Sequence, residues 1–283
     1  MRGRHRATIM NLHPRLLLTP CLAIVCILGT DVAAAQTPTN DLLSHARWQA
    51  VLVEHVRDGR VDYNALARRP DPLRGYLASL VAVDPAQFAA LPKPDRLAFW
   101  VNAYNAWTVD LVLRNSPLES IRDIVPLWKR ALGNSAFSLP FIPLGQLDPR
   151  GARSEPLSLD DIEHGIIRPL FGEPRAHFAL VCASVSCPEL RSEAWTGAML
   201  EAQLEDAGRR LLGDKTKNRY VPDTHVLQLS SIFMWFREDF ESAGGLVTFA
   251  ARYLPEADQV LLRAQNDPPN IEFLPYDWSL NAR

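Results

Sequence analysis

The chain has 283 residues, and 47% of them are hydrophobic, which is enough apolar material for one large core. Its 30 basic and 32 acidic residues give a formal charge of −2, and no run of Lys and Arg follows the first 35 residues. Because phosphate binding needs such a cluster, the composition argues against nucleic acid as a partner.

The first 35 residues are typical of an export signal. Four arginines precede an apolar stretch at residues 16–28, and three alanines at residues 33–35 suit a cleavage site. We therefore expect a protein that is exported to the periplasm or secreted. The apolar stretch contains Pro20 and is short for a membrane span, so an uncleaved anchor is the weaker alternative and no stable span is expected after cleavage. Cleavage would leave only Cys182 and Cys187 of the four cysteines.

Residues 36–92 are predicted to form an N-terminal helical segment. Apolar residues recur at helical spacing over residues 42–56 and again over residues 72–83, which predicts two amphipathic packing helices. Together with this segment, the core at residues 93–283 is expected to form a single globular domain.

A longer helix over residues 95–114 is expected at the centre of the core. It is apolar nearly all the way round, which is typical of burial on most faces. Asn102 and Asn105 lie on one face, and an unpaired buried amide would cost about 1–3 kcal/mol per lost hydrogen bond. They either bond to buried backbone or face a site, where they would hold a catalytic histidine or an oxyanion.

Ser158 begins the next predicted helix with a capping-box pattern, and Pro169 is expected to end it. On this helix Asp160 lies four residues before His164, so its carboxylate can reach the imidazole and fix its tautomer. Glu163 is adjacent to His164 in sequence but points elsewhere. A surface or packing role for His164 is the alternative.

Residues 175–182 are predicted to form a buried strand because they contain a short apolar run between Pro174 and Ser184. Side chains alternate along a strand, so His177 and Cys182 would lie on opposite faces and could not pair. Cys187 precedes Pro188, a pattern that predicts the start of a helix. Because the positive end of a helix dipole favours a thiolate, Cys187 is the better candidate for a nucleophile.

The last third of the chain alternates between helices and strands. A helix is predicted over residues 197–212, a strand pair at 219–221 and 225–229, an aromatic helical turn at 230–240, a helix at 246–253 and an extended segment at 271–280. The predicted class is therefore α+β, mainly helical with a small, mostly antiparallel sheet.

Five motifs occur in order along the chain. They are Phe99-Trp-Val-Asn-Ala-Tyr-Asn105, Leu159-Asp-Asp-Ile-Glu-His164, His177-Phe-Ala-Leu-Val-Cys-Ala-Ser-Val-Ser-Cys-Pro-Glu-Leu190, Ser231-Ile-Phe-Met-Trp-Phe236 with Asp239-Phe240, and Tyr276-Asp-Trp-Ser-Leu280. Together they resemble the DUF547 family, a domain of unknown function, over roughly residues 62–280. The resemblance implies a core similar to papain-like and transglutaminase-like folds, although the thiol here follows a predicted strand rather than starting the central helix.

Three functions remain open. The first is a cysteine-dependent hydrolase or acyl transferase acting on a peptide, a cell-envelope component or a small molecule. In this enzyme Cys187 would be the nucleophile and His164 the base, with His177 as a reserve base. Asp160 or Glu163 would orient the base. Asn102 or Asn105 would be the polar helper.

The second function is a binding or structural module in which a Cys182–Cys187 disulfide clips the predicted strand to the following helix. It can close only if residues 183–186 fold back and bring the Cα atoms within roughly 4.4–6.8 Å. An oxidising compartment favours this bond, which could also be redox-active.

The third function is a zinc site built from Cys182, Cys187, His164 and His177. A Cys-x₄-Cys spacing is loose for zinc, and no second close pair of ligands occurs. No other cofactor is expected, because the glycine-rich and Gly-x-Ser-x-Gly signatures are absent.

Overall fold

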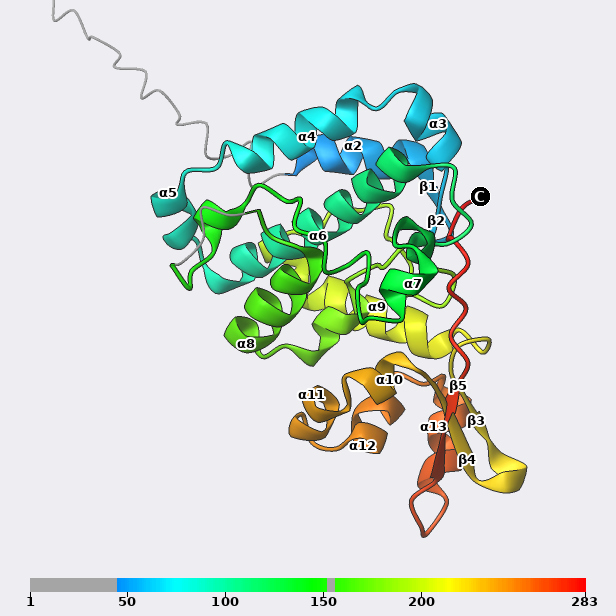
Figure 1. Ribbon diagram of the computed structural model, residues 1–283. Helices are drawn as coiled ribbons and strands as arrows, with labels where there is room; N and C mark the ends of the chain where they lie inside the picture. Colours follow the sequence, from blue (N-terminus) through cyan, green and yellow to red (C-terminus); the bar gives the residue numbers. More distant parts are fainter. Residues whose placement is uncertain (1–44, 152–155) are drawn as a thin grey trace, which may run out of the picture. The chain divides into compact units, whose positions relative to one another are not determined.

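The computed structural model describes residues 45–151 and 156–283, so the predicted export signal lies outside the described residues. The described chain is mainly helical and carries a two-stranded and a three-stranded sheet, which confirms the predicted α+β class (Figure 1). In these two ranges, no helix combines the length and the apolar character needed to cross a membrane.

The elements follow one another with short connections. The first half contains α2 (Ala46–His55), β1 (Val56–Arg57), β2 (Arg60–Val61), α3 (Tyr63–Arg68), α4 (Asp71–Val81), α5 (Pro85–Ala89), α6 (Lys93–Asn115) and α7 (Leu127–Arg130). The second half contains a π-helix (Asp161–Ile167), α8 (Arg168–Phe171), a 3₁₀ turn (Pro174–Phe178), α9 (Leu200–Gly213), β3 (Arg219–Val221), β4 (Val226–Ser230), α10 (Ile232–Trp235), α11 (Arg237–Ser242), α12 (Leu246–Ala251), α13 (Glu256–Arg263) and β5 (Asn270–Leu274). Further 3₁₀ turns lie at Ile121–Ile124, Gly145–Leu147, Gly197–Met199 and Pro222–Thr224.

The two predicted N-terminal helices are confirmed as α2 and α4, which pack against each other through their apolar faces. Trp48 of α2 stacks on Tyr76 of α4, with ring centroids 5.7 Å apart. Two shorter helices, α3 and α5, have no counterpart in the sequence analysis. Each is capped by an aspartate side chain, Asp62 or Asp84, that accepts from a backbone N–H in the first turn.

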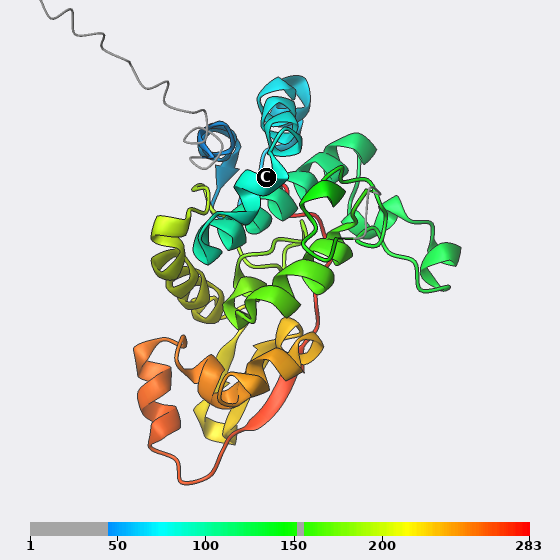
Figure 2. The same ribbon diagram turned by 90° about the vertical axis from the view of Figure 1, so that its left-hand side faces the viewer.

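Helix α6 is the central element, as predicted. Every residue from 97 to 112 is buried, and α6 contacts α4 on one side and the π-helix on the other (Figures 1 and 2). Burial on all faces requires partners for its polar side chains, and Asn102 and Asn105 are almost fully buried. This helix therefore organises the loops around it through hydrogen bonds as well as through apolar packing.

The helix predicted to begin at Ser158 has the expected capping box. The N–H of Asp161 donates to Ser158 Oγ at 3.0 Å, and the N–H of Ser158 donates to the Asp161 carboxylate at 3.0 Å. The prediction that Pro169 ends the helix is wrong, because the π-helix continues into α8 and Pro169 lies in the first turn of α8. Pro169 therefore lies next to the junction at which the π-helix passes into α8, where the hydrogen-bond pattern changes and the missing N–H is accommodated.

The strand predicted at residues 175–182 is not formed. Pro174–Phe178 is a 3₁₀ turn, and residues 179–182 follow as a turn and irregular chain that belongs to no strand. Asn105 of α6 takes the place of a neighbouring strand, since its Nδ2 donates to Ala179 O and its Oδ1 accepts from the N–H of Val181, both at 2.9 Å. The alternation that separated His177 from Cys182 therefore does not apply.

The helix predicted to begin at Cys187 is also wrong, because residues 188–196 contain no helix. The side chain of Asn102 on α6 bonds to the backbone of this stretch instead. It donates to Trp195 O at 2.7 Å and accepts from the Trp195 N–H at 3.0 Å. Cys187 thus has no helix dipole to stabilise a thiolate, and any activation must come from other groups.

The strand pair is confirmed as β3 and β4, which run antiparallel, and β5 lies parallel to β4. Helices α10 to α13 form the connection between β4 and β5 (Figure 1). After β5 the chain returns toward the N-terminal half, where Ser279 bridges Ser120, Leu280 bridges Ser184, and Ala282 bridges Val61. This return places the terminal aromatic motif beside the loop that carries the two cysteines.

Candidate functional site

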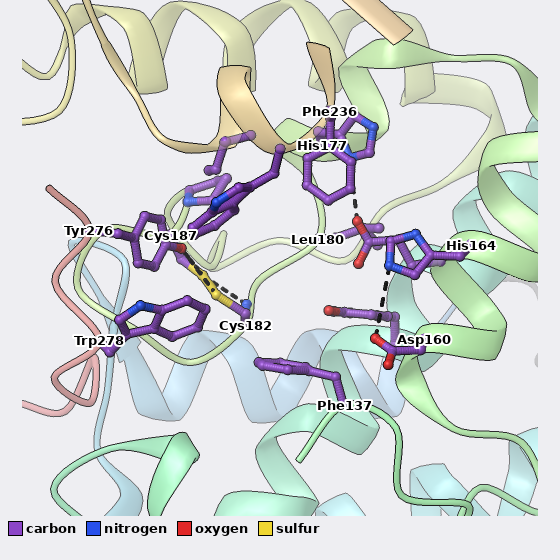
Figure 3. Close-up of a pocket in the computed structure, with 15 residues that line it drawn as sticks. Phe137, Asp160, His164, His177, Leu180, Cys182, Cys187, Phe236, Tyr276 and Trp278 are labelled. Atoms are coloured by element: carbon purple, nitrogen blue, oxygen red, sulfur yellow. Dashed lines mark hydrogen bonds and ion pairs between the residues drawn. A yellow bond between two sulfur atoms is a disulfide. The ribbon is translucent and has the colours of Figure 1, made fainter. Parts of the chain in front are cut away.

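One cavity of about 140 Å³ brings together six of the eight residues proposed from the sequence (Figure 3). These are Asp160, Glu163, His164, His177, Cys182 and Cys187. The cavity is also lined by aromatic side chains from four separate parts of the chain, namely Tyr104, Phe137, Trp235, Phe236, Tyr276 and Trp278. Asn102 and Asn105 do not line it, because their amide groups bond to the backbone of the surrounding loops.

The two cysteines form a disulfide in the wall of this cavity. Their Cα atoms are 6.1 Å apart, within the range that the sequence analysis required. The intervening loop folds back through Ala183, which has a φ of 59°, and through a 3.1 Å hydrogen bond from the N–H of Cys187 to Ser184 O. In this state neither sulfur is a free nucleophile or a thiolate ligand.

The zinc site considered from the sequence finds no geometric support in the described part of the chain. Both cysteine sulfurs are joined to each other. Among the described residues, no group of three or more His, Cys, Asp and Glu side chains is arranged to hold a metal ion.

The sulfur of Cys187 is surrounded by hydrogen-bond donors. The N–H of Cys182 lies 2.9 Å from Cys187 Sγ, the Tyr276 hydroxyl 3.2 Å and the Ser184 hydroxyl 3.3 Å. Burial raises the pKa of Tyr276 well above its ordinary value, so its hydroxyl keeps the proton that it donates. Cys187 is 2% exposed, whereas Cys182 is only partly buried.

His177 is held in one orientation by its neighbours. Its Nε2 is 2.7 Å from Asp239, and Asp239 accepts two hydrogen bonds from the Arg168 guanidinium. The imidazole stacks on Phe236 with centroids 3.8 Å apart. Nδ1 lies 3.4 Å from Glu163 Oε1 and has no hydrogen-bond partner among the described residues.

The ion pair between Asp239 and Arg168 beside His177 was not predicted from the sequence. Asp239 was noted only as part of a family motif, and Arg168 only falls within a predicted helix. Arg168 lies one turn after His164 and reaches Asp239 of α11, 71 residues later in the chain. The Arg168 guanidinium, and secondly His177, hold the pKa of Asp239 below its usual range. No local pattern could have revealed a bond over that separation.

His164 and Asp160 lie on the more open side of the cavity. His164 Nε2 is 3.9 Å from Asp160 Oδ1, which is an ion-pair distance rather than a hydrogen bond, and both side chains are about 40% exposed. Burial of its carboxyl group raises the pKa of Asp160. Glu163 points away from His164, as expected, and toward His177.

An aromatic cluster forms the opposite wall, and one of its residues, Trp235, belongs to the aromatic helical turn predicted at residues 230–240. The ring centroids of Trp235, Tyr276 and Trp278 are 4.6–5.6 Å apart. Phe137 lies next to Trp278 at 6.3 Å. Two of the five sequence motifs, Ser231–Phe236 and Tyr276–Leu280, contain these three rings, but their proximity could not be predicted because Trp235 and the C-terminal segment meet only in the folded chain.

Comparison with known proteins gives a family but no activity. Residues 88–212 match the family model described as "Protein of unknown function, DUF547", so the chain carries a DUF547 domain over that span. The matched span includes the two cysteines and His164 and His177, and it ends before Trp235, Asp239 and Tyr276. No curated protein and no solved structure matches the chain.

Proposed function

We propose that this chain, which carries a DUF547 domain over residues 88–212, is an exported binding module whose cavity holds the cationic end of a small molecule or peptide. The observation that carries the proposal is the combination of an aromatic cluster with two carboxylates in one cavity. The electron-rich faces of Trp and Tyr attract ammonium groups, and a carboxylate adds a direct charge pair. The disulfide forms part of the wall between them.

The charges around the cavity favour a cation. Asp160 and Glu163 both line it, and the neighbouring Arg168 is neutralised by its two hydrogen bonds to Asp239. Arg122 stacks over Trp278 at 5.3 Å but does not line the cavity. The carboxylates therefore dominate the field that a ligand would meet.

The size of the cavity limits what it can hold. Its volume of about 140 Å³ is close to that of an engineered apolar cavity that binds benzene, roughly 150 Å³. It therefore accommodates a trimethylammonium group or the amine end of a side chain, with the rest of the ligand outside. The disulfide and the mutually packed rings hold the walls in place, which lowers the ordering cost of binding.

Binding can be tested by Trp fluorescence with two probes of the same shape. Choline carries the charge, and 3,3-dimethyl-1-butanol is its neutral isostere. We expect choline to bind at least about tenfold more tightly, because a desolvated cation–π contact contributes about 2 kcal/mol.

The variant Trp278→Ala is expected to abolish the difference between the two probes. The matched control is Trp128→Ala, which removes a 64% exposed Trp on α7 outside the cavity. Equal affinity for choline and its neutral isostere in the unaltered protein would contradict the proposal.

A second candidate is the cysteine-dependent hydrolase or acyl transferase, in a reduced form of the protein. It is favoured by the position of His177, which lines the same cavity as Cys187 and is oriented by Asp239 through Nε2. Cys187 would be the nucleophile, His177 or His164 the base, and Asp239 or Asp160 the orienting carboxylate. Asn102 and Asn105, proposed from the sequence as polar helpers, are left out of this assignment because their amides are already bonded to backbone.

The test for this activity is a burst of p-nitrophenol from p-nitrophenyl acetate after reduction with dithiothreitol. An acetyl adduct on Cys187, seen by peptide mass spectrometry and lost in Cys187→Ala, is the expected result. Turnover that survives in Cys187→Ala, or the absence of an adduct, would rule out this candidate.

Two further parts of the proposal concern location and extent. Export is proposed from the signal-like residues 1–35, and the N-terminus of the periplasmic or secreted protein should then begin near Gln36. The DUF547 likeness is proposed to extend over residues 62–280, since Trp235, Tyr276 and Trp278 line the same cavity as residues of the matched span. N-terminal sequencing of the exported protein tests the first part.

A further inference from the structure

The two sulfurs of the disulfide differ in their surroundings. Cys182 is partly exposed and Cys187 is 2% exposed, although both line the same cavity. An incoming thiolate must approach in line with the bond that it breaks, so the exposed sulfur is the one open to attack. Cys187 is then the sulfur that leaves.

Cys187 is also the sulfur that the protein is built to stabilise as an anion. Three donors lie within hydrogen-bond distance of Cys187 Sγ, namely the N–H of Cys182, the Tyr276 hydroxyl and the Ser184 hydroxyl. Figure 3 shows Tyr276 beside the disulfide. The same two hydroxyls also lie 3.2 Å from Cys182 Sγ, and each has a single proton to donate, so the N–H of Cys182 at 2.9 Å is the donor that distinguishes Cys187 from Cys182. Hydrogen bonds to a charged acceptor are about twice as strong as neutral ones, so these donors gain strength when Cys187 becomes a thiolate.

We propose that the Cys182–Cys187 disulfide is a redox couple that exchanges with an external dithiol, with Cys182 as the attacked sulfur and Cys187 as the stabilised leaving thiolate. This activity does not depend on the cation site proposed above. The external dithiol belongs to the class of exported dithiol proteins, for which dithiothreitol or glutathione can substitute in the test tube.

The exchange balances in two steps. A thiolate of the dithiol attacks Cys182 Sγ and forms a mixed disulfide, and the electron pair of the Cys182–Cys187 bond leaves on Cys187 Sγ. The second thiolate of the dithiol then attacks its own bonded sulfur in the mixed disulfide and releases Cys182, which takes up a proton. Two electrons have passed from the dithiol to the protein, and the dithiol has become a disulfide.

Other charged groups around the couple act in both directions. Asp160 and Glu163 line the cavity and oppose a thiolate, and the imidazoles of His164 and His177 line it as well. The Lys217 ammonium, bonded to Cys187 O at 2.9 Å and paired with Asp214, favours a thiolate. The direct donors are closest to the sulfur, and the proposal rests on them.

The first experiment compares the two single thiols. Cys187→Ser leaves Cys182 and Cys182→Ser leaves Cys187, and each folded variant is treated with DTNB, an aromatic disulfide. At a pH well above the ordinary Cys pKa of about 8.5 both thiols are ionised, so access to the sulfur decides the rate, and we expect the Cys182 thiol to react at least about tenfold faster. Equal rates, or faster reaction at Cys187, would overturn the assigned polarity.

The second experiment keeps both cysteines and alters a donor. The wild-type protein and Tyr276→Phe are equilibrated with reduced and oxidised glutathione, and the reduced fraction is read by thiol alkylation and mass spectrometry. Loss of the hydroxyl is expected to shift the equilibrium toward the disulfide by at least about fivefold, because a charge-assisted hydrogen bond to the reduced form is removed.

The matched control is Tyr220→Phe, which removes a hydroxyl that bonds His225 outside the cavity. Near-UV circular dichroism confirms that all variants remain folded. A disulfide that resists excess dithiothreitol in the folded protein would overturn the proposal, and so would an equilibrium that Tyr276→Phe leaves unchanged. Failure of choline binding, which is measured on the oxidised protein, would leave this result untouched.

Discussion

Replacing Asn105 by alanine should destabilise the whole fold rather than only a site. The Asn105 side chain donates to Ala179 O and accepts from the Val181 N–H, and Asn105 is 2% exposed. The substitution therefore leaves two buried backbone groups without partners. Each costs about 1–3 kcal/mol, and partial entry of water reduces the sum, so we expect a loss of about 2–4 kcal/mol in the unfolding free energy.

The assay is urea denaturation followed by Trp fluorescence under oxidising conditions. For a domain of this size the same loss corresponds to a melting temperature lower by roughly 4–16 °C. The control is Asn134→Ala, whose amide makes one exposed hydrogen bond to Lys129 O and should change stability by less than about 0.5 kcal/mol. A loss below about 1 kcal/mol in Asn105→Ala would refute the view that Asn105 acts as a backbone brace.

Three titratable groups give the remaining predictions. Burial raises the pKa of Asp160, so choline affinity measured by fluorescence should fall as pH drops through that raised value, and Asp160→Asn should remove the step. Arg168 lowers the pKa of Asp239, so this carboxylate contributes stability that is present above about pH 4 and lost as pH falls further. At neutral pH, Asp239→Asn should lower the unfolding free energy measured in urea by about 1–3 kcal/mol. In acid, the unfolding free energies of the variant and the unaltered protein should become equal. Burial lowers the pKa of His45 to about 4, so the unfolding free energy should fall between about pH 6.5 and 4, where only the unfolded chain binds the proton, and His45→Gln should flatten that slope in the same assay.

The helices that were predicted correctly are those whose signals are local. Helix α4 buries the four apolar residues of its periodic stripe, and the Ser158 capping box forms with the expected pair of hydrogen bonds. Spacing of 3.6 residues and cap chemistry act within one or two turns, so the sequence around them is sufficient.

The segment around the cysteines was predicted incorrectly because its backbone partners come from far away. An apolar run such as residues 177–182 is compatible with a strand, a helix or a buried loop. Asn105 and Asn102 of α6 decide the matter by satisfying the backbone at Ala179, Val181 and Trp195. Because these backbone groups already have partners, the segment needs no neighbouring strand before Cys187 and no helix after it.

The sequence by itself determined the α+β class, the central position of α6 and the choice of residues to examine. The tertiary structure alone decided which of those residues share a cavity and which sulfur is protected. Cys187 gained one of its three donors from Tyr276, 89 residues later, and His177 gained its carboxylate from Asp239, 62 residues later. Periodicity and capping report interactions between neighbours in the chain, whereas the chemistry of a thiol or an imidazole depends on groups that only folding brings within hydrogen-bond distance.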